Sequence, residues 1–327
     1  MMESLVGATL DGERVDRAVA LLSGLSRAEV AELVAAGAVR LDGLPVTSRA
    51  RRIRAGQLLG VELPAPTPEA GSDPDPTVTV PVVYEDADLL VVDKPAGLVV
   101  HPGAGHRRGT LVQGLLARYP DIAELAGDGA AEGAGGEGAG GGRGPGERPG
   151  IVHRLDKGTS GLLVVARSEA ARASLVADLA AHRVERRYSV LVAGSVQADG
   201  GLVDAPLGRS GRDPTRIAVQ SGGREARTRY RVERRLSTPE AVTLLECRLE
   251  TGRTHQIRVH LATIGHPVVG DPRYGGRRAA AVARLLPPDR PWLHARALAF
   301  AHPVTGEALS FVSPLPGDLQ AVLDELG

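Results

Sequence analysis

The chain of 327 residues is poor in cysteine, aromatic residues and lysine. Each shortage bears on the kinds of structure or site that the chain can form. Its single cysteine, Cys247, excludes an intrachain disulfide and a cysteine-based zinc cluster. Aromatic residues make up only 2% of the sequence, so aliphatic side chains must fill most of the core. Lysine occurs at two positions, and the other 37 basic residues are arginine. Genomic base composition is the first explanation of this excess, although arginine also suits phosphate binding and base stacking.

The sequence also lacks the signals of export and membrane insertion. Its N-terminus has no basic and apolar signal-peptide segments, and no apolar run approaches the roughly 18 residues that a membrane span needs. We therefore expect a cytoplasmic protein without a membrane partner. The net charge of +0 argues mildly against a nucleic-acid partner, although the distribution of charge matters more than its sum.

The length predicts two domains, and composition indicates where they divide. Prolines cluster just before residue 78, as is typical of a semi-rigid linker, so we expect a first domain over residues 1–66 and a linker over 67–77. The second domain is expected over 78–327. Within it, residues 126–150 are almost all Gly, Ala, Glu, Arg and Pro, a composition that predicts a disordered insertion.

The first domain combines helix and hairpin patterns with a basic cluster. Ser26 and Glu29 form a capping box that predicts the start of a helix, and residues 39–46 predict a hairpin around Asp42-Gly43. Two short helices, a hairpin and neighbouring arginines resemble the S4-like RNA-binding domain. An ordinary solvated surface is the alternative to RNA contacts for these arginines. They are Arg49, Arg51, Arg52 and Arg54.

The most informative segment is His153–Gly161, which reads HRLDKGTSG. An apolar run over residues 162–166 follows it and predicts a buried strand. We therefore expect His153, Arg154 and Asp156 on a loop that enters a sheet, where a rigid scaffold can hold reactive groups. A simple polar turn is the alternative, because Asp, Gly, Thr and Ser all favour turns.

This segment resembles the signature of the RluA/RluD-type RNA pseudouridine synthases, H-R-L-D-x-x-T-S/T-G, at every fixed position. Residues 185–188, 249–261 and 265–275 resemble further motifs of that family in the same order, and the similarity spans nearly all of residues 78–315. The resemblance implies an α+β fold whose catalytic domain has a mixed, mainly antiparallel sheet flanked by helices. The additional N-terminal domain points to the RluD-like branch, which implies a monomer that converts uridine to pseudouridine in large-subunit ribosomal RNA.

The reaction of that family exchanges an N–C bond for a C–C bond without net oxidation, so neither a nicotinamide nor a metal is expected. A carboxylate can act at a sugar carbon as nucleophile or base, and Asp156 is the only carboxylate in the signature. Which of these roles it takes stays open. By resemblance, Arg258 keeps Asp156 ionised, and Tyr188 stacks on the uracil and helps to move a proton.

The other residues of the signature are expected to serve binding and loop shape. Arg154 has a planar guanidinium that can stack in the space left by an everted uridine. His153 could contact a phosphate or make a structural hydrogen bond, and Thr159, Ser160 and Gly161 are expected to shape the loop. The basic stretch between residues 209 and 235 predicts a rim that contacts phosphates, with a solvated strand surface as the alternative.

Two other function classes remain possible from the sequence. A non-catalytic RNA-binding or ribosome-assembly factor could keep the same scaffold, but the intact Asp156, Tyr188 and Arg258 argue against it. A glycoside-type hydrolase would need a second carboxylate, which the signature does not offer. His255 and His260 are five residues apart and would diverge on a helix, so we expect no metal site.

Overall fold

The computed structural model describes residues 2–7, 10–23, 27–62, 73–102, 108–125, 148–211, 213 and 216–327. These residues divide between two compact units, 2–62 and 73–327. Most of the expected linker, nearly all of the expected glycine-rich insertion and Ser26 of the capping box lie outside the described residues. No helix in the described ranges has both the length and the apolar character to cross a membrane.

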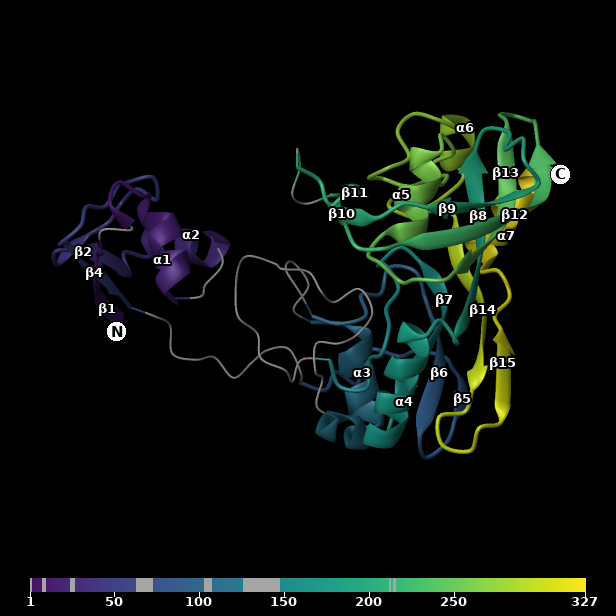
Figure 1. Cartoon of the computed structure of the whole chain (residues 1–327), viewed down its shortest axis with the longest axis horizontal. Helices are drawn as coiled ribbons and strands as arrows, with labels where there is room; N and C mark the ends of the chain where they lie inside the picture. The colour runs from purple at the N-terminus through teal and green to yellow at the C-terminus, as the bar shows by residue number, and fades with distance from the viewer. Residues whose placement is uncertain are drawn as a thin grey trace. The chain divides into compact units, whose positions relative to one another are not determined.

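The smaller unit packs two helices against a four-stranded antiparallel sheet (Figure 1). Its strands follow the order β1-β4-β2-β3. Asp42 and Gly43 both have positive φ, 50° and 80°, as a two-residue hairpin turn requires, which confirms the predicted hairpin. The elements are β1 (Met2–Leu5), α1 (Val15–Ser23), α2 (Arg27–Ala35), β2 (Val39–Leu41), β3 (Leu44–Pro45) and β4 (Leu58–Val61).

The larger unit is built on one mixed sheet of the order β5-β6-β7-β14-β8-β13-β12-β9, with β15 paired to β14. Only β7 and β14 run parallel, so the predicted α+β fold with a mainly antiparallel sheet is confirmed. Its strands are β5 (Val82–Glu85), β6 (Leu89–Lys94), β7 (Ser160–Ala166), β8 (Glu185–Ala193), β9 (Gly200–Asp204), β12 (Arg227–Leu236), β13 (Val242–Leu249), β14 (Leu293–Ala301) and β15 (Ala308–Val312).

Helices and one small hairpin complete the larger unit. In Figure 1, α3 and α4 lie beside β6 and β7, and α5 lies beside the hairpin of β10 and β11. Every residue of β7 is buried, as its continuous apolar run predicts. The remaining elements are α3 (Leu111–Arg118), the 3₁₀ helix η2 (Pro120–Glu124), α4 (Glu169–Ala180), β10 (Leu207–Arg209), β11 (Ile217–Val219), α5 (Gln256–Thr263), α6 (Ala280–Ala283) and α7 (Gly317–Leu326).

Gly161 fixes the place where the signature loop enters the sheet. It pairs with Ala295 where β7 meets β14 and has a φ of +114°, a conformation that side chains rarely adopt. A Cβ at this position would lie 2.3 Å from the carbonyl oxygen of Ala295. Glycine is therefore required both by the backbone conformation and by the close approach of the neighbouring strand.

We expect Gly161→Ala to lower the free energy of unfolding by at least about 3 kcal/mol, because positive φ and a backbone clash add together. Denaturant titration would measure this loss. Gly306→Ala is the matched control, since Gly306 has a φ of +74° with no atom within 4 Å of its added Cβ. Its loss should be only about 1 kcal/mol. Equal losses in the two variants would show that the contact with β14 does not determine the choice of glycine.

Candidate active site

Asp156 lies on the loop that precedes β7, with 19% of its side chain exposed. The loop is held by backbone hydrogen bonds from Thr159 N–H to the Asp156 carbonyl (3.0 Å) and from Gly97 N–H to the Lys157 carbonyl (2.8 Å). Lys94, fully buried at the end of β6, donates through Nζ to two carbonyls of the neighbouring turn. Backbone and buried lysine together place the carboxylate on a well-supported segment.

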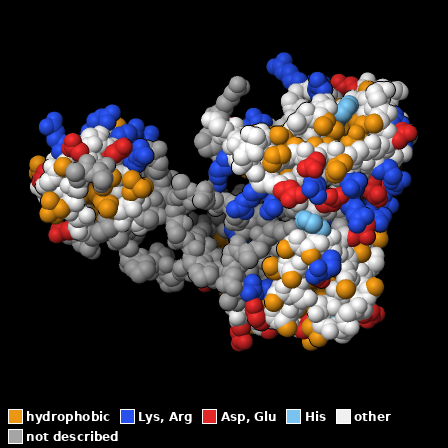
Figure 2. Space-filling model, viewed as in Figure 1, with side chains coloured by type: hydrophobic (Ala, Val, Ile, Leu, Met, Phe, Trp, Pro, Cys, Tyr) orange, Lys and Arg blue, Asp and Glu red, His pale blue; other side chains and the backbone are white. Residues whose placement is uncertain are grey.

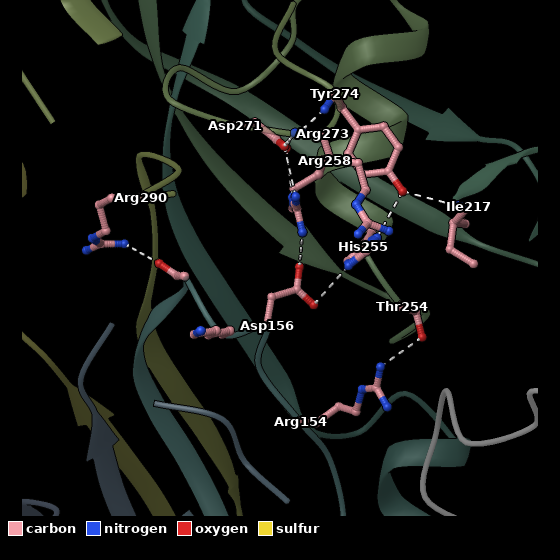
Figure 3. Close-up of polar contacts among 12 residues, drawn as sticks. Arg154, Asp156, Ile217, Thr254, His255, Arg258, Asp271, Arg273, Tyr274 and Arg290 are labelled. Atoms are coloured by element: carbon pink, nitrogen blue, oxygen red, sulfur yellow. Dashed lines mark hydrogen bonds and ion pairs between the residues drawn. The ribbon is translucent and has the colours of Figure 1, made fainter. Parts of the chain in front are cut away.

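Arg258 joins Asp156 to a second carboxylate, Asp271 (Figure 3). Its Nη1 donates to Asp156 Oδ2 at 2.8 Å, while Nε and Nη2 donate to the two oxygens of Asp271 at 2.7 and 2.8 Å. The Asp271 side chain is 0% exposed and also accepts backbone N–H groups of Arg273 and Tyr274. The guanidinium is therefore fixed in orientation and offers a single nitrogen to Asp156.

His255 approaches the other oxygen of Asp156, with its Nε2 4.0 Å from Oδ1. Its Nδ1 lies 2.9 Å from the hydroxyl of Tyr274, which also accepts the backbone N–H of Ile217 from β11 (Figure 3). Among the described residues, none forms a hydrogen bond with Asp156 Oδ1. One carboxylate oxygen is thus bound by arginine, and the other faces open space beside an imidazole.

The surroundings of Asp156 keep it ionised. Burial raises the pKa of its carboxyl, but the charge of His255, the charge and hydrogen bond of Arg258 and the charge of Arg154 together hold that pKa below its ordinary value. Burial also opposes ionisation of Asp271, and the contacts with Arg258 again lower its pKa. Arg258, between two carboxylates, has a raised pKa despite its burial. All three groups are therefore charged at neutral pH.

Two connected hollows meet at Asp156. A cleft of about 1180 Å³ is lined by Asp156, Arg154 and Arg258 together with Arg216 and Arg273. A recess of about 50 Å³ shares the first three of these residues and is lined further by Tyr188. The cleft is basic and suits an anionic chain, whereas the recess suits a small flat group.

Tyr188 and Arg154 both line the recess beside Asp156. Tyr188, on β8, is 6% exposed, and burial raises the pKa of its phenol to about 12, so it is protonated at neutral pH. Arg154 donates through Nη2 to the hydroxyl of Thr254 at 3.3 Å and borders both hollows. Asp156, Tyr188, Arg258 and Arg154 therefore come together in one site.

His153 lines the recess but is almost fully buried. Its ring is 4% exposed, its Nε2 accepts the backbone N–H of Val164 at 3.1 Å, and burial lowers its pKa to about 3. The structural hydrogen bond, the alternative left by the sequence, is observed, and the phosphate contact stays a prediction. His153 ties the signature loop to the middle of β7.

Strand β12 carries part of the expected phosphate rim, and its arginines are engaged with carboxylates. Figure 2 shows basic and acidic side chains interspersed on this unit. Because these arginines already pair with carboxylates of the protein, β12 resembles an ordinary solvated strand surface more than a rim that contacts phosphates. The pairs join Arg227 to Asp204 and Glu225, Arg229 to Glu250, Arg231 to Glu246, and Arg235 to Asp199.

The four arginines predicted to contact RNA in the smaller unit are exposed, and Figure 2 shows basic side chains along one side of that unit. They are Arg49, Arg51, Arg52 and Arg54.

Sequence reasoning missed Asp271, Lys94 and the pairing of His255 with Tyr274. Asp271 lies in a Gly-Asp-Pro turn, and only the folded loop shows that its carboxylate faces Arg258. A buried lysine at the end of an apolar strand is a recognisable signal, because lysine is rarely buried without partners. The described residues include one cluster with metal-ligand geometry, Asp86, Asp88 and His302, and hydrogen bonds within the protein already occupy it.

The sequence is similar to those of known RNA pseudouridine synthases. A family model for RNA pseudouridylate synthase matches residues 88–263. Ribosomal large subunit pseudouridine synthase D of Xanthomonas campestris is 41% identical over 100% of this chain and 92% of its own length. An uncharacterized RNA pseudouridine synthase of Chloroflexus aurantiacus is 47% identical over 98% of this chain and 92% of its own length.

A solved structure shares both the fold and part of the sequence. Human RNA pseudouridylate synthase domain containing 1 is 27% identical, covers 76% of this chain and 90% of its own, and superposes with a TM-score of 0.54. The family match covers more than half of the chain, and the relatives align along nearly its whole length. The chain therefore belongs to the RNA pseudouridine synthase family.

Proposed function

We propose that the protein isomerises specific uridines of large-subunit ribosomal RNA to pseudouridine, with Asp156 as the essential carboxylate. The observation that carries the proposal is an ionised carboxylate held by Arg258 where a basic cleft meets a small recess. Relatives named ribosomal large subunit pseudouridine synthase D support this choice of RNA. The RNA chain would lie in the cleft and one everted base would enter the recess, at an unstacking cost of a few kcal/mol.

The geometry of Asp156 suggests which oxygen reacts. Oδ2 receives the Arg258 hydrogen bond, whereas Oδ1 faces open space and is free to act at the sugar as nucleophile or base. In the overall reaction the C1′–N1 bond breaks and a C1′–C5 bond forms. A proton leaves C5 and one is taken up at N1, so atoms and electrons balance without a cofactor.

Tyr188 and Arg154 have complementary roles in this proposal. The Tyr188 ring lines the recess beside Asp156 and offers a flat surface for the uracil. Arg154, at the border of both hollows, would stack in the space vacated by the everted base. We further propose that residues 1–66 form an S4-like RNA-binding domain that contacts phosphates through its exposed arginine cluster, and that residues 67–77 link it to the catalytic domain.

We expect Tyr188→Phe to slow pseudouridine formation about 10²-fold while RNA affinity is retained, because the ring remains and the phenolic proton is lost. Single-turnover kinetics and a binding titration would separate the two effects. The rate of the unchanged enzyme should show no tyrosine ionisation below about pH 11, since the pKa of Tyr188 is raised to about 12. An unchanged rate in Tyr188→Phe would restrict Tyr188 to packing and stacking.

Incubation of the purified protein with unmodified large-subunit ribosomal RNA, followed by mapping of pseudouridine, tests the function directly. We expect new pseudouridine at a small number of defined positions. If the protein binds this RNA but forms no pseudouridine, the assembly-factor alternative replaces the enzyme. Release of free uracil without pseudouridine would instead indicate a hydrolase.

A further inference from the structure

The recess beside Asp156 contains a polar group that no step of the proposed reaction uses. Thr159 lines the recess and is 2% exposed. Within the part of the chain that the structure describes, its hydroxyl has no hydrogen-bond partner. A buried hydroxyl without a partner is unfavourable for folding and is uncommon in proteins, so its retention at this place requires a reason.

A second polar side chain lines the same recess. Arg186 lies on β8 two residues before Tyr188, on the same buried face of the strand, and is 3% exposed. The rest of the wall includes the apolar side chains of Leu249, Ile257 and Leu293. The wall of the recess thus contains a buried hydroxyl and a buried guanidinium among apolar side chains, a composition typical of small-molecule sites.

The size of the recess fits a single ring and not a nucleotide. One water molecule needs about 10–15 Å³ of cavity volume. The recess, at about 50 Å³, therefore has room for a few water molecules or for one small ring. The sugar and phosphates would therefore remain in the cleft, where Asp156 borders both spaces.

Uracil offers a chemically distinctive edge to such a recess. Its O2, N3–H and O4 present an acceptor, a donor and an acceptor, the same order from either end. The isomerisation requires a turn of the detached ring that exchanges N1 with C5, and the axis of that turn passes through N3 and C6. N3–H therefore stays in place while the two carbonyls exchange positions, and one set of protein contacts can hold the base before and after the turn.

Resting on the proposed function, we propose that Thr159 is a specificity-determining residue whose hydroxyl accepts the N3–H of the everted uracil, with the Arg186 guanidinium facing an adjacent carbonyl oxygen. Cytosine has an amino group at C4, which would place a donor against the Arg186 guanidinium, and its unprotonated N3 would require the Thr159 hydroxyl to turn round and donate. The pair would thereby select uracil and serve as the pivot for its turn.

The test replaces Thr159 by valine, which has the same shape and no hydroxyl. We expect the single-turnover rate of pseudouridine formation to fall by roughly 10-fold or more while the dissociation constant for RNA stays within about twofold, because most RNA contacts lie outside the recess. Because a partnerless buried hydroxyl is removed, the melting temperature should stay the same or rise. A structural role for the hydroxyl would lower the melting temperature.

Thr243→Val is the matched control. Thr243 is 0% exposed and away from the recess, and its hydroxyl donates to the Gly194 carbonyl at 2.8 Å and accepts from Val196 N–H at 3.1 Å. This variant should lower the melting temperature and leave the rate within about twofold of the unchanged enzyme. The two valine variants are thus expected to show opposite patterns.

A modified substrate assigns the contact to N3. RNA with N3-methyluridine at the target should react far more slowly than RNA with uridine in the unchanged enzyme. Valine keeps the shape of threonine, so the methyl group meets the same steric hindrance in Thr159→Val as in the unchanged enzyme. The variant should therefore react more slowly with uridine but no more slowly with N3-methyluridine. The ratio of the two rates should shrink by the same roughly 10-fold factor as the rate with uridine.

The results separate the two proposals. The unchanged enzyme could form pseudouridine while Thr159→Val keeps the same rate and the same preference for uridine over N3-methyluridine. That result would overturn the role of Thr159 and leave the proposed function standing. Absence of pseudouridine with the unchanged enzyme would overturn the proposed function and this inference with it.

Discussion

Replacement of Asp156 by asparagine should abolish pseudouridine formation, with a loss of at least about 10³-fold in the single-turnover rate. Asparagine keeps an oxygen that can accept from Arg258 Nη1, so the loop and the RNA affinity should survive. The negative charge that acts at the sugar is lost. Because the pKa of Asp156 is held below its ordinary value, the unchanged enzyme should show no titration of this group near neutral pH. Quantification of pseudouridine and an RNA-binding titration measure the two quantities.

Asp178→Asn provides a matched control for this result. Asp178 on α4 pairs with Arg183 and has 15% of its side chain exposed, close to the 19% of Asp156. Its substitution should change the rate by no more than about twofold, because Asp178 lines neither the cleft nor the recess. Appreciable turnover in Asp156→Asn would transfer the essential role to another group and refute the proposed chemistry.

Substitution of Arg258 by lysine is expected to lower the rate about 10²-fold to 10³-fold even though the positive charge is kept. Lysine has a single nitrogen and cannot bind both oxygens of Asp271 while also donating to Asp156. The carboxylate then loses its fixed partner, and small displacements of reacting groups are costly in rate. Single-turnover kinetics with RNA in excess of its dissociation constant would measure the effect on the reaction itself.

Arg229→Lys is the control for charge-preserving substitution, since Arg229 is exposed and pairs with Glu250 on the outer surface of the sheet. It should react at nearly the rate of the unchanged enzyme. If Arg258→Lys also retained full activity, the geometry of the guanidinium would be irrelevant and charge alone would suffice.

Local sequence patterns are sufficient to predict those elements that depend mainly on their own residues and not on distant contacts. The apolar run at residues 162–166 forms the buried β7, and Ser168 caps α4 by accepting the N–H of Ala171. Threonine is a favoured helix cap, but Thr254 does not cap α5. Thr254 instead accepts a hydrogen bond from Arg154, and His255, with a φ of 56°, occupies the cap position without a side-chain cap bond. A contact from a distant loop therefore overrode the local preference of threonine.

The site itself could be predicted only as far as the family resemblance extended. Asp156 and Arg258 are 102 positions apart, and nothing in their spacing brings them together. Asp271 escaped prediction because its role depends on how the loop after α5 closes over the guanidinium. His153 points inward because its ring accepts a hydrogen bond from the backbone of β7. The residues next to His153 in the sequence do not predict this contact.

The double attachment of Arg258 has a consequence for how the enzyme meets its polyanionic substrate. A guanidinium held by Asp156 alone could be drawn to an incoming phosphodiester, and the carboxylate would then lose its counter-ion at the moment of reaction. Here Asp271 occupies two of the donor nitrogens from the buried side, and Asp156 takes the third. Every nitrogen of this guanidinium therefore already holds a carboxylate oxygen, and an incoming phosphodiester would have to displace one of the two aspartates to take over the cation.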